Sequence, residues 1–160
     1  MKRYVFRLGL VLAALLVSAA ESRAEEVPVS GEIVNVKLLD PGVLTISPGG
    51  ILTIEGLVTD ERLNGDLKGT MLVTSTFMVN INTGEGLLFG TIEWQDPHSE
   101  GGFRGPFLGQ VAGAFGPGLG EFDGQWELSG FGTHEGETAL IHNFGSFSKH
   151  QLYEGVILGE

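Results

Sequence analysis

Residues 103 to 129 alternate between two kinds of side chain with a period of two. Phe103, Phe107 and Phe115 share one parity with several glycines, so a large residue repeatedly follows a small one. From Glu121 to Ser129, apolar Phe122 and Trp126 alternate with carboxylate, amide and hydroxyl side chains. A period of two is typical of β-strands, and the second run predicts a strand with one face in water.

The remaining apolar runs also predict short strands, separated by turns rich in glycine and proline. Asp40-Pro41-Gly42 and Ser47-Pro48-Gly49-Gly50 are turn signals, and Asn82 to Gly86 supplies a hairpin reversal. Thr59 to Asp66 is polar, and we expect it to form a loop. About eight to nine strands are predicted, at residues 33–39, 43–46, 51–58, 70–81, 87–96, 103–115, 120–133, 138–147 and 151–158.

The glycine content favours a barrel over a sandwich, the two architectures that such strands can form. Twenty-five of the residues from 25 to 160 are glycine, well above an average usage of about 7%. Glycine weakens a flat strand, but a small barrel needs sharply bent walls and alternating small and large interior side chains. We therefore expect an all-β fold, an antiparallel eight-stranded β-barrel over residues 32–160, with a sandwich as the alternative.

The N-terminus resembles an export signal. Residues 1–24 contain a basic start, a 13-residue apolar run from Leu8 to Ala20, and small residues at Ser22 and Ala24. The run is short for a membrane span, which favours a cleavable signal peptide over an anchor or a core helix. We expect a signal helix at 1–24, a flexible lead-in at 25–31, and a protein that is secreted or periplasmic.

Charge and cysteine content narrow the possible partners. Residues 25–160 hold five Lys or Arg and nineteen Asp or Glu, a net charge of −14. Such a chain is repelled by nucleic acid and by anionic membrane surfaces. We expect no nucleic-acid partner and no stable membrane insertion once the signal is removed. The chain has no cysteine, so we expect packing rather than disulfides to stabilise it.

Several short glycine-containing motifs are spread along the chain, namely Thr83-Gly84-Glu85-Gly86, Gly90-Thr91, the Gly101 to Gly113 run, Gly130 to Gly136 and Tyr153-Glu154-Gly155. The chain resembles the allene oxide cyclase-like and dirigent-like barrels, part of the calycin-like group, including uncharacterised bacterial secreted members. The resemblance implies an eight-stranded barrel with a central apolar cavity, often a homotrimer. No catalytic residue of the plant cyclases or dirigent proteins matches a position here, so the resemblance implies the fold and not an activity.

Few residues qualify for chemistry. His142 shares a face with apolar Leu140 and Phe144, so it is a weak candidate for an inward acid or base. Glu93 is a second weak candidate, because a carboxylate inside a barrel has its pKa raised by desolvation. His98 and His134 lie beside carboxylates, but without the spacing of a metal site. We predict no metal and no cofactor.

Three functions stay open at this point. The first is a binding or interaction module that holds a small apolar molecule inside the barrel. The second is a cyclase or isomerase acting on an apolar substrate in the same cavity. The third is an outer-membrane barrel, against which the scarcity of Trp and Tyr counts. The predicted cavity lining is Phe77, Trp94, Phe107, Phe115, Trp126, His142 and Phe144.

Overall fold

Nine antiparallel strands account for almost all of the described chain. The structure is a computed structural model, and it describes residues 25–114, 120–147 and 151–159. The only helical element in these residues is the single 3-10 turn η1, Gly132–His134. The strands are β1 (Glu26–Asp40), β2 (Val43–Ile46), β3 (Ile51–Gly65), β4 (Gly69–Asn80), β5 (Gly86–Gln95), β6 (Gly102–Ala112), β7 (Glu121–Phe131), β8 (Thr138–Ser146) and β9 (Gln151–Leu158).

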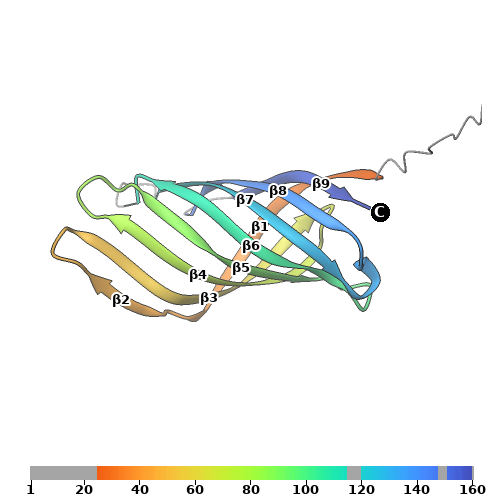
Figure 1. Cartoon of the computed structure of the whole chain (residues 1–160), viewed down its shortest axis with the longest axis horizontal. Helices are drawn as coiled ribbons and strands as arrows, with labels where there is room; N and C mark the ends of the chain where they lie inside the picture. The colour runs from red at the N-terminus through yellow and green to blue at the C-terminus, as the bar shows by residue number, and fades with distance from the viewer. Residues whose placement is uncertain (1–24, 115–119, 148–150, 160) are drawn as a thin grey trace, which may run out of the picture.

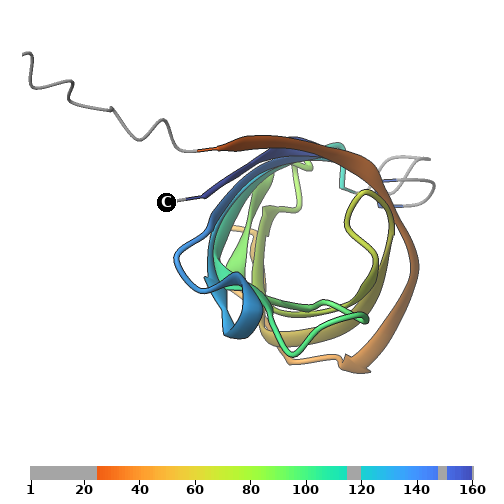
Figure 2. The same cartoon turned by 90° about the vertical axis from the view of Figure 1, so that its right-hand side faces the viewer.

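Eight of the strands form a closed ring. Each strand from β3 to β8 pairs with the next one in the chain, and β1 pairs with both β9 and β3, which closes the barrel (Figure 1). The β2 strand pairs with β3 alone and lies outside this ring. Figure 2, seen along the barrel, shows the ring and the connection between β3 and β4, drawn in yellow, folded within it. The predicted fold class, an eight-stranded antiparallel barrel, is confirmed.

The alternation in β6 and β7 produces one buried face. Phe103, Phe107 and Val111 are buried on β6, and the residues of the opposite parity, Arg104, Pro106, Leu108 and Gln110, are exposed. A side chain on Gly109 or Gly124 would collide with the ring of Phe122, which lies across both glycines. The glycines in these strands therefore leave room for aromatic side chains inside the barrel, as the alternation predicted.

Two stretches expected to be irregular are strands. Residues 26–31, expected to belong to a flexible lead-in, form the first part of β1 and pair with β9. Residues 59–65, expected to be a loop, belong to β3 and pair with both β1 and β4. Both stretches are polar or contain Pro and Gly, yet β9 pairs with the first stretch and two neighbouring strands pair with the second. The predicted signal helix lies outside the described residues.

The connection between β3 and β4 is anchored inside one end of the barrel. Leu67 is buried, and its N–H donates a hydrogen bond to the Tyr153 hydroxyl oxygen at 2.9 Å. The same hydroxyl donates to the Leu67 carbonyl at 3.0 Å, and the Trp94 Nε1–H donates to the Lys68 carbonyl at 2.9 Å. Stacking of Trp94 on Phe103, with ring centroids 5.7 Å apart, completes this end.

No helix in the described residues is long and apolar enough to cross a bilayer.

Candidate functional site

Four of the predicted cavity-lining residues point into the barrel. Trp94, Phe107 and Trp126 are buried, and Phe77 is partly buried against them. They belong to one continuous cluster of apolar side chains contributed by all eight strands of the ring and by Leu67. Their packing against each other makes them part of the core.

Other predicted site residues lie on the outside. His142 keeps 40% of its side chain exposed, because Ala139, Ile141 and Asn143 take the inward positions of β8. Phe144 shares the outward face, with its ring centroid 4.9 Å from that of His142. The expectation that His142 points inward is wrong. Phe115 lies outside the described residues.

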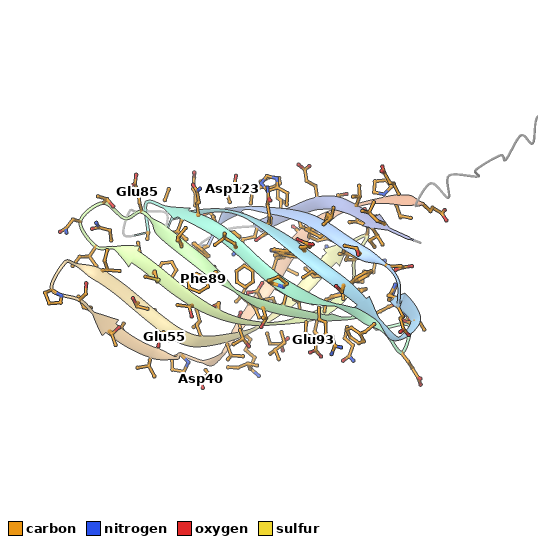
Figure 3. The ribbon with its side chains drawn as sticks, in the orientation of Figure 1. Asp40, Glu55, Glu85, Phe89, Glu93 and Asp123 are labelled. Carbon is orange, nitrogen blue, oxygen red and sulfur yellow. The ribbon has the colours of Figure 1, made fainter. Side chains whose placement is uncertain are left out.

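Glu93 is also outside the barrel. It is exposed on β5, between buried Ile92 and Trp94 (Figure 3). The inward carboxyl is Glu61, which the sequence reasoning missed because it assigned residues 59–66 to a loop. Glu61 lies opposite buried Met71, so it shares the inner face of β3.

The environment of Glu61 favours its neutral form. Burial raises the pKa of the Glu61 carboxyl above its ordinary value, and the neighbouring charge of Asp60 adds to this. The Thr59 hydroxyl donates to Glu61 Oε1 at 2.8 Å, which offsets part of the rise. Glu61 stays partly exposed, so water reaches it. In the sequence, only the alternation of Glu61 with apolar Leu63 could have placed Glu61 on the inner face of its strand.

A groove with a volume of about 1020 Å³ lies on the outer surface. It crosses β6, β7, β8, β9 and β1. Its exposed residues are outward-facing, whereas Phe107, Trp126 and Ile141 beneath it are buried. Residues of the opposite barrel wall are absent from its lining, which places the groove outside the ring of strands.

Two parallel rows of outward side chains border this groove. Register fixes each row, because residues opposite one another on neighbouring strands share a face. Asp66 extends the second row, since its carboxylate accepts hydrogen bonds from the Ser30 N–H at 2.8 Å and the Ser30 hydroxyl at 3.1 Å. The proline row is Pro106, Glu127, Leu140, Val156 and Pro28, and the histidine row is Leu108, Gln125, His142, Glu154, Ser30 and Asp66.

The two rows differ in chemistry. The proline row presents four apolar side chains and Glu127, while the histidine row is mainly polar. His142 Nε2 lies 3.1 Å from Asp123 Oδ1, and His142 Nδ1 lies 3.8 Å from Glu154 Oε1, so the imidazole is held between two carboxylates. None of the lining residues is Lys or Arg. The groove therefore combines an apolar side with an excess of negative charge.

A separate ionic cluster closes the end of the barrel near η1. His134 Nδ1 lies 2.7 Å from Glu137 Oε2, and His134 Nε2 lies 3.4 Å from Asp96 Oδ2. Hydrogen bonds from the His98 N–H and the Ser99 hydroxyl, together with His134, lower the pKa of Asp96. The His134 ring packs 4.8 Å from Phe103, centroid to centroid, which indicates a structural role. Within the described residues no group of three or more His, Asp or Glu could hold a metal ion.

Comparisons with known proteins add no relative. No protein-family model, curated protein or solved structure matches the chain. The fold and the groove therefore carry the functional argument.

Proposed function

We propose that this protein is an exported β-barrel that binds a small amphiphilic molecule, with an apolar body and a basic group, in its outer groove. The observation that carries this proposal is the groove itself, where an apolar row faces a polar, acidic row across five strands. At the usual strand spacing of about 4.8 Å, the groove runs about 19 Å from β6 to β1, so an elongated ligand fits it best.

Each part of the ligand has a counterpart in the groove. Leu140 lies at the centre of the proline row, between Glu127 and Val156 on the neighbouring strands. An alkyl chain or flat ring laid along this row would remove apolar surface from water, the main source of affinity in most small-molecule sites. Asp66, Glu127 and Glu154 would pair with a basic group, because the lining contains no Lys or Arg that competes for them.

The groove is a better supported site than the barrel interior. An interior site needs space among side chains, yet Trp94, Phe107 and Trp126 pack in the core. The alternative, an isomerase or cyclase, needs a polar group in that interior, and Glu61 is now its candidate in place of His142 and Glu93. Retention of activity by a Glu61→Gln variant, on any substrate that the wild type converts, would remove this alternative.

Side-chain orientation also supports a barrel surrounded by water. The outer face of β7 is exposed and carries Glu121, Asp123 and Glu127, while its inner face is buried and apolar. Membrane barrels show the reverse pattern, with an apolar band facing lipid. Export itself is proposed from the N-terminal sequence, and detection of the mature chain starting near Glu25 in a periplasmic or culture fraction would test it.

Isothermal titration calorimetry with three ligands of equal chain length tests the proposal. n-Decylammonium and n-decyl sulfate, each below its micelle concentration, and n-decanol, below its solubility limit, differ only in their head groups. We expect n-decylammonium to bind at least about tenfold more tightly than n-decyl sulfate, a difference of about 1.4 kcal/mol. Equal affinities, or preference for the sulfate, would contradict the proposed acidic site.

A matched pair of variants tests the location. Leu140 and Leu152 are both outward-facing and almost equally exposed, at 41% and 43%, but only Leu140 lines the groove. We expect Leu140→Lys to weaken n-decylammonium binding at least about tenfold, because a cation enters the apolar row, and Leu152→Lys to leave it within about twofold. If both variants behave alike, the ligand does not bind in this groove.

A further inference from the structure

A free sheet edge runs along residues 36–46. Among the described residues, β1 pairs only with β3 from Val34 onward, because the described pairing with β9 ends at Ile33. The β2 strand pairs with the same side of β3, further along, and with no other strand in the described structure. Both segments lie along one side of β3, so together they form a single edge whose outer backbone groups are available for pairing.

This edge carries an unusual share of exposed apolar surface. Sixteen large apolar residues are exposed in the described chain, and six of them lie within the eleven residues of the edge. An exposed apolar edge strand is a template on which another strand can pair. The six residues are Val36, Leu38, Leu39, Val43, Leu44 and Ile46.

The apolar pattern of the edge reads the same in both directions around Pro41. Antiparallel pairing of two copies about Pro41 sets Leu38 opposite Leu44, Val36 opposite Ile46 and Leu39 opposite Val43. Leu38 pairs with Thr59 and Leu44 with Ile54, both on the inner face of β3, so the opposed leucines share a face. Because Pro41 has no N–H to donate, the hydrogen bonds between the two copies would form on both sides of Pro41.

Charge is compatible with the same arrangement. The edge contains only Lys37 and Asp40 as charged residues, which the pairing sets opposite Thr45 and Gly42. No like charges therefore oppose each other, although the chain from residue 25 carries a net charge of −14. Self-complementarity under a two-fold axis is the defining property of an isologous interface.

We propose that two copies of this chain form a two-fold dimer by pairing residues 36–46 edge to edge, with the axis near Pro41. This inference is independent of the ligand proposed for the outer groove. The dimer would join the two barrels into one continuous sheet and cover the aliphatic side chains of both edges. The occupant of the edge is thus a second copy of the chain.

Sedimentation velocity of residues 25–160 over a wide concentration range tests the assembly. We expect a monomer–dimer equilibrium whose dissociation constant rises at least about tenfold in Leu44→Asp. Leu72→Asp, a similarly exposed leucine on the outer face of β4, should leave that constant unchanged. A monomer at all concentrations, a trimer, or equal effects of both variants would overturn the proposal.

Cysteine cross-linking tests the register without weakening the interface. Opposite residues of antiparallel strands have Cα atoms about 4.5–5.5 Å apart, within the range that a disulfide spans. The chain has no native cysteine, so single-cysteine variants give a clean background. An equal mixture of Leu38→Cys and Leu44→Cys chains should form a mixed disulfide dimer on mild oxidation, while the mixture of Leu38→Cys and Lys37→Cys should not. Equal yields from the two mixtures would overturn the register.

Discussion

The buried hydroxyl of Tyr153 leads to a specific prediction about the stability of this barrel. Among the side-chain hydrogen bonds of the described residues, only those of this hydroxyl join β9 to the connection that follows β3, 86 residues earlier in the chain. Both of its hydrogen bonds go to Leu67, one to the N–H and one to the carbonyl. Tyr153 is 1% exposed and Leu67 is 6% exposed, so water replaces neither bond easily.

Tyr153→Phe removes one oxygen atom and leaves two buried backbone groups without that partner. Each unsatisfied buried group costs about 1–3 kcal/mol, and the lost desolvation of the hydroxyl offsets part of the sum. We expect the free energy of unfolding to fall by about 2–4 kcal/mol. For a chain of this size, that lowers the midpoint of thermal unfolding by about 7–14 °C.

Urea and thermal unfolding of residues 25–160, followed by circular dichroism, measure this change. Hydrogen exchange at the Leu67 amide supplies a local readout, and its protection should disappear in the variant. Gly31→Ala is a second arm, because a β-carbon there would collide with the Asn64 carbonyl of β3 and with the Tyr153 hydroxyl. A loss below about 0.5 kcal/mol with Leu67 still protected would refute the role assigned to this hydroxyl.

Three further predictions concern stability. Glu61→Gln should be more stable than the wild type at neutral pH, because partial burial raises the pKa of Glu61 and the wild type loses stability as pH rises above the ordinary value of 4.5. The gain should vanish below that pH, and denaturant curves against pH, with exposed Glu93→Gln as control, will show whether it does. Asp96→Asn should lower the free energy of unfolding at neutral pH. The lowered pKa of Asp96 contributes stability that is lost only as pH falls through its folded-state value. A stability difference between variant and wild type that stays constant in acid would contradict this. Gly109→Ala should cost about 1–3 kcal/mol by displacing the Phe122 ring, whereas Gly49→Ala, in an open turn, should be nearly neutral in the same assay.

The sequence was most informative where one face of a strand was clearly apolar and the other polar. The alternation in β6 and β7 predicted both strands and their inward faces, including Phe107 and Trp126. The glycines that share the buried face of these strands indicated a barrel, because they leave room for rings such as Phe122. In these elements, local pattern and tertiary packing agree.

Strand β8 shows why the placement of His142 failed. Leu140, His142 and Phe144 form an apolar face by sequence, and so do Ala139 and Ile141 on the other parity. The inner face includes polar Asn143, which is buried because its side-chain amide donates to the Leu152 carbonyl at 2.9 Å. With two apolar faces, periodicity cannot choose the inner one, and only the register with β7 and β9 does.

The groove could not be predicted for a related reason. Its two rows are drawn from five strands and from Asp66, and their adjacency depends on the register of four strand pairs. Glu61 was missed because four polar or charged residues from Thr59 to Arg62 suggested a loop. Pairing on both sides makes this segment a strand despite its polarity.

The central claim is that ligand binds on the outside of the barrel, and amide chemical-shift mapping by NMR tests it most directly. Titration of n-decylammonium into isotope-labelled protein should shift the amides of Glu127, Leu140 and Glu154, which border the groove. The amides around Phe77 and Leu88, on the inner wall, should stay in place. Shifts confined to the inner wall, or no shifts at saturating ligand, would contradict the account.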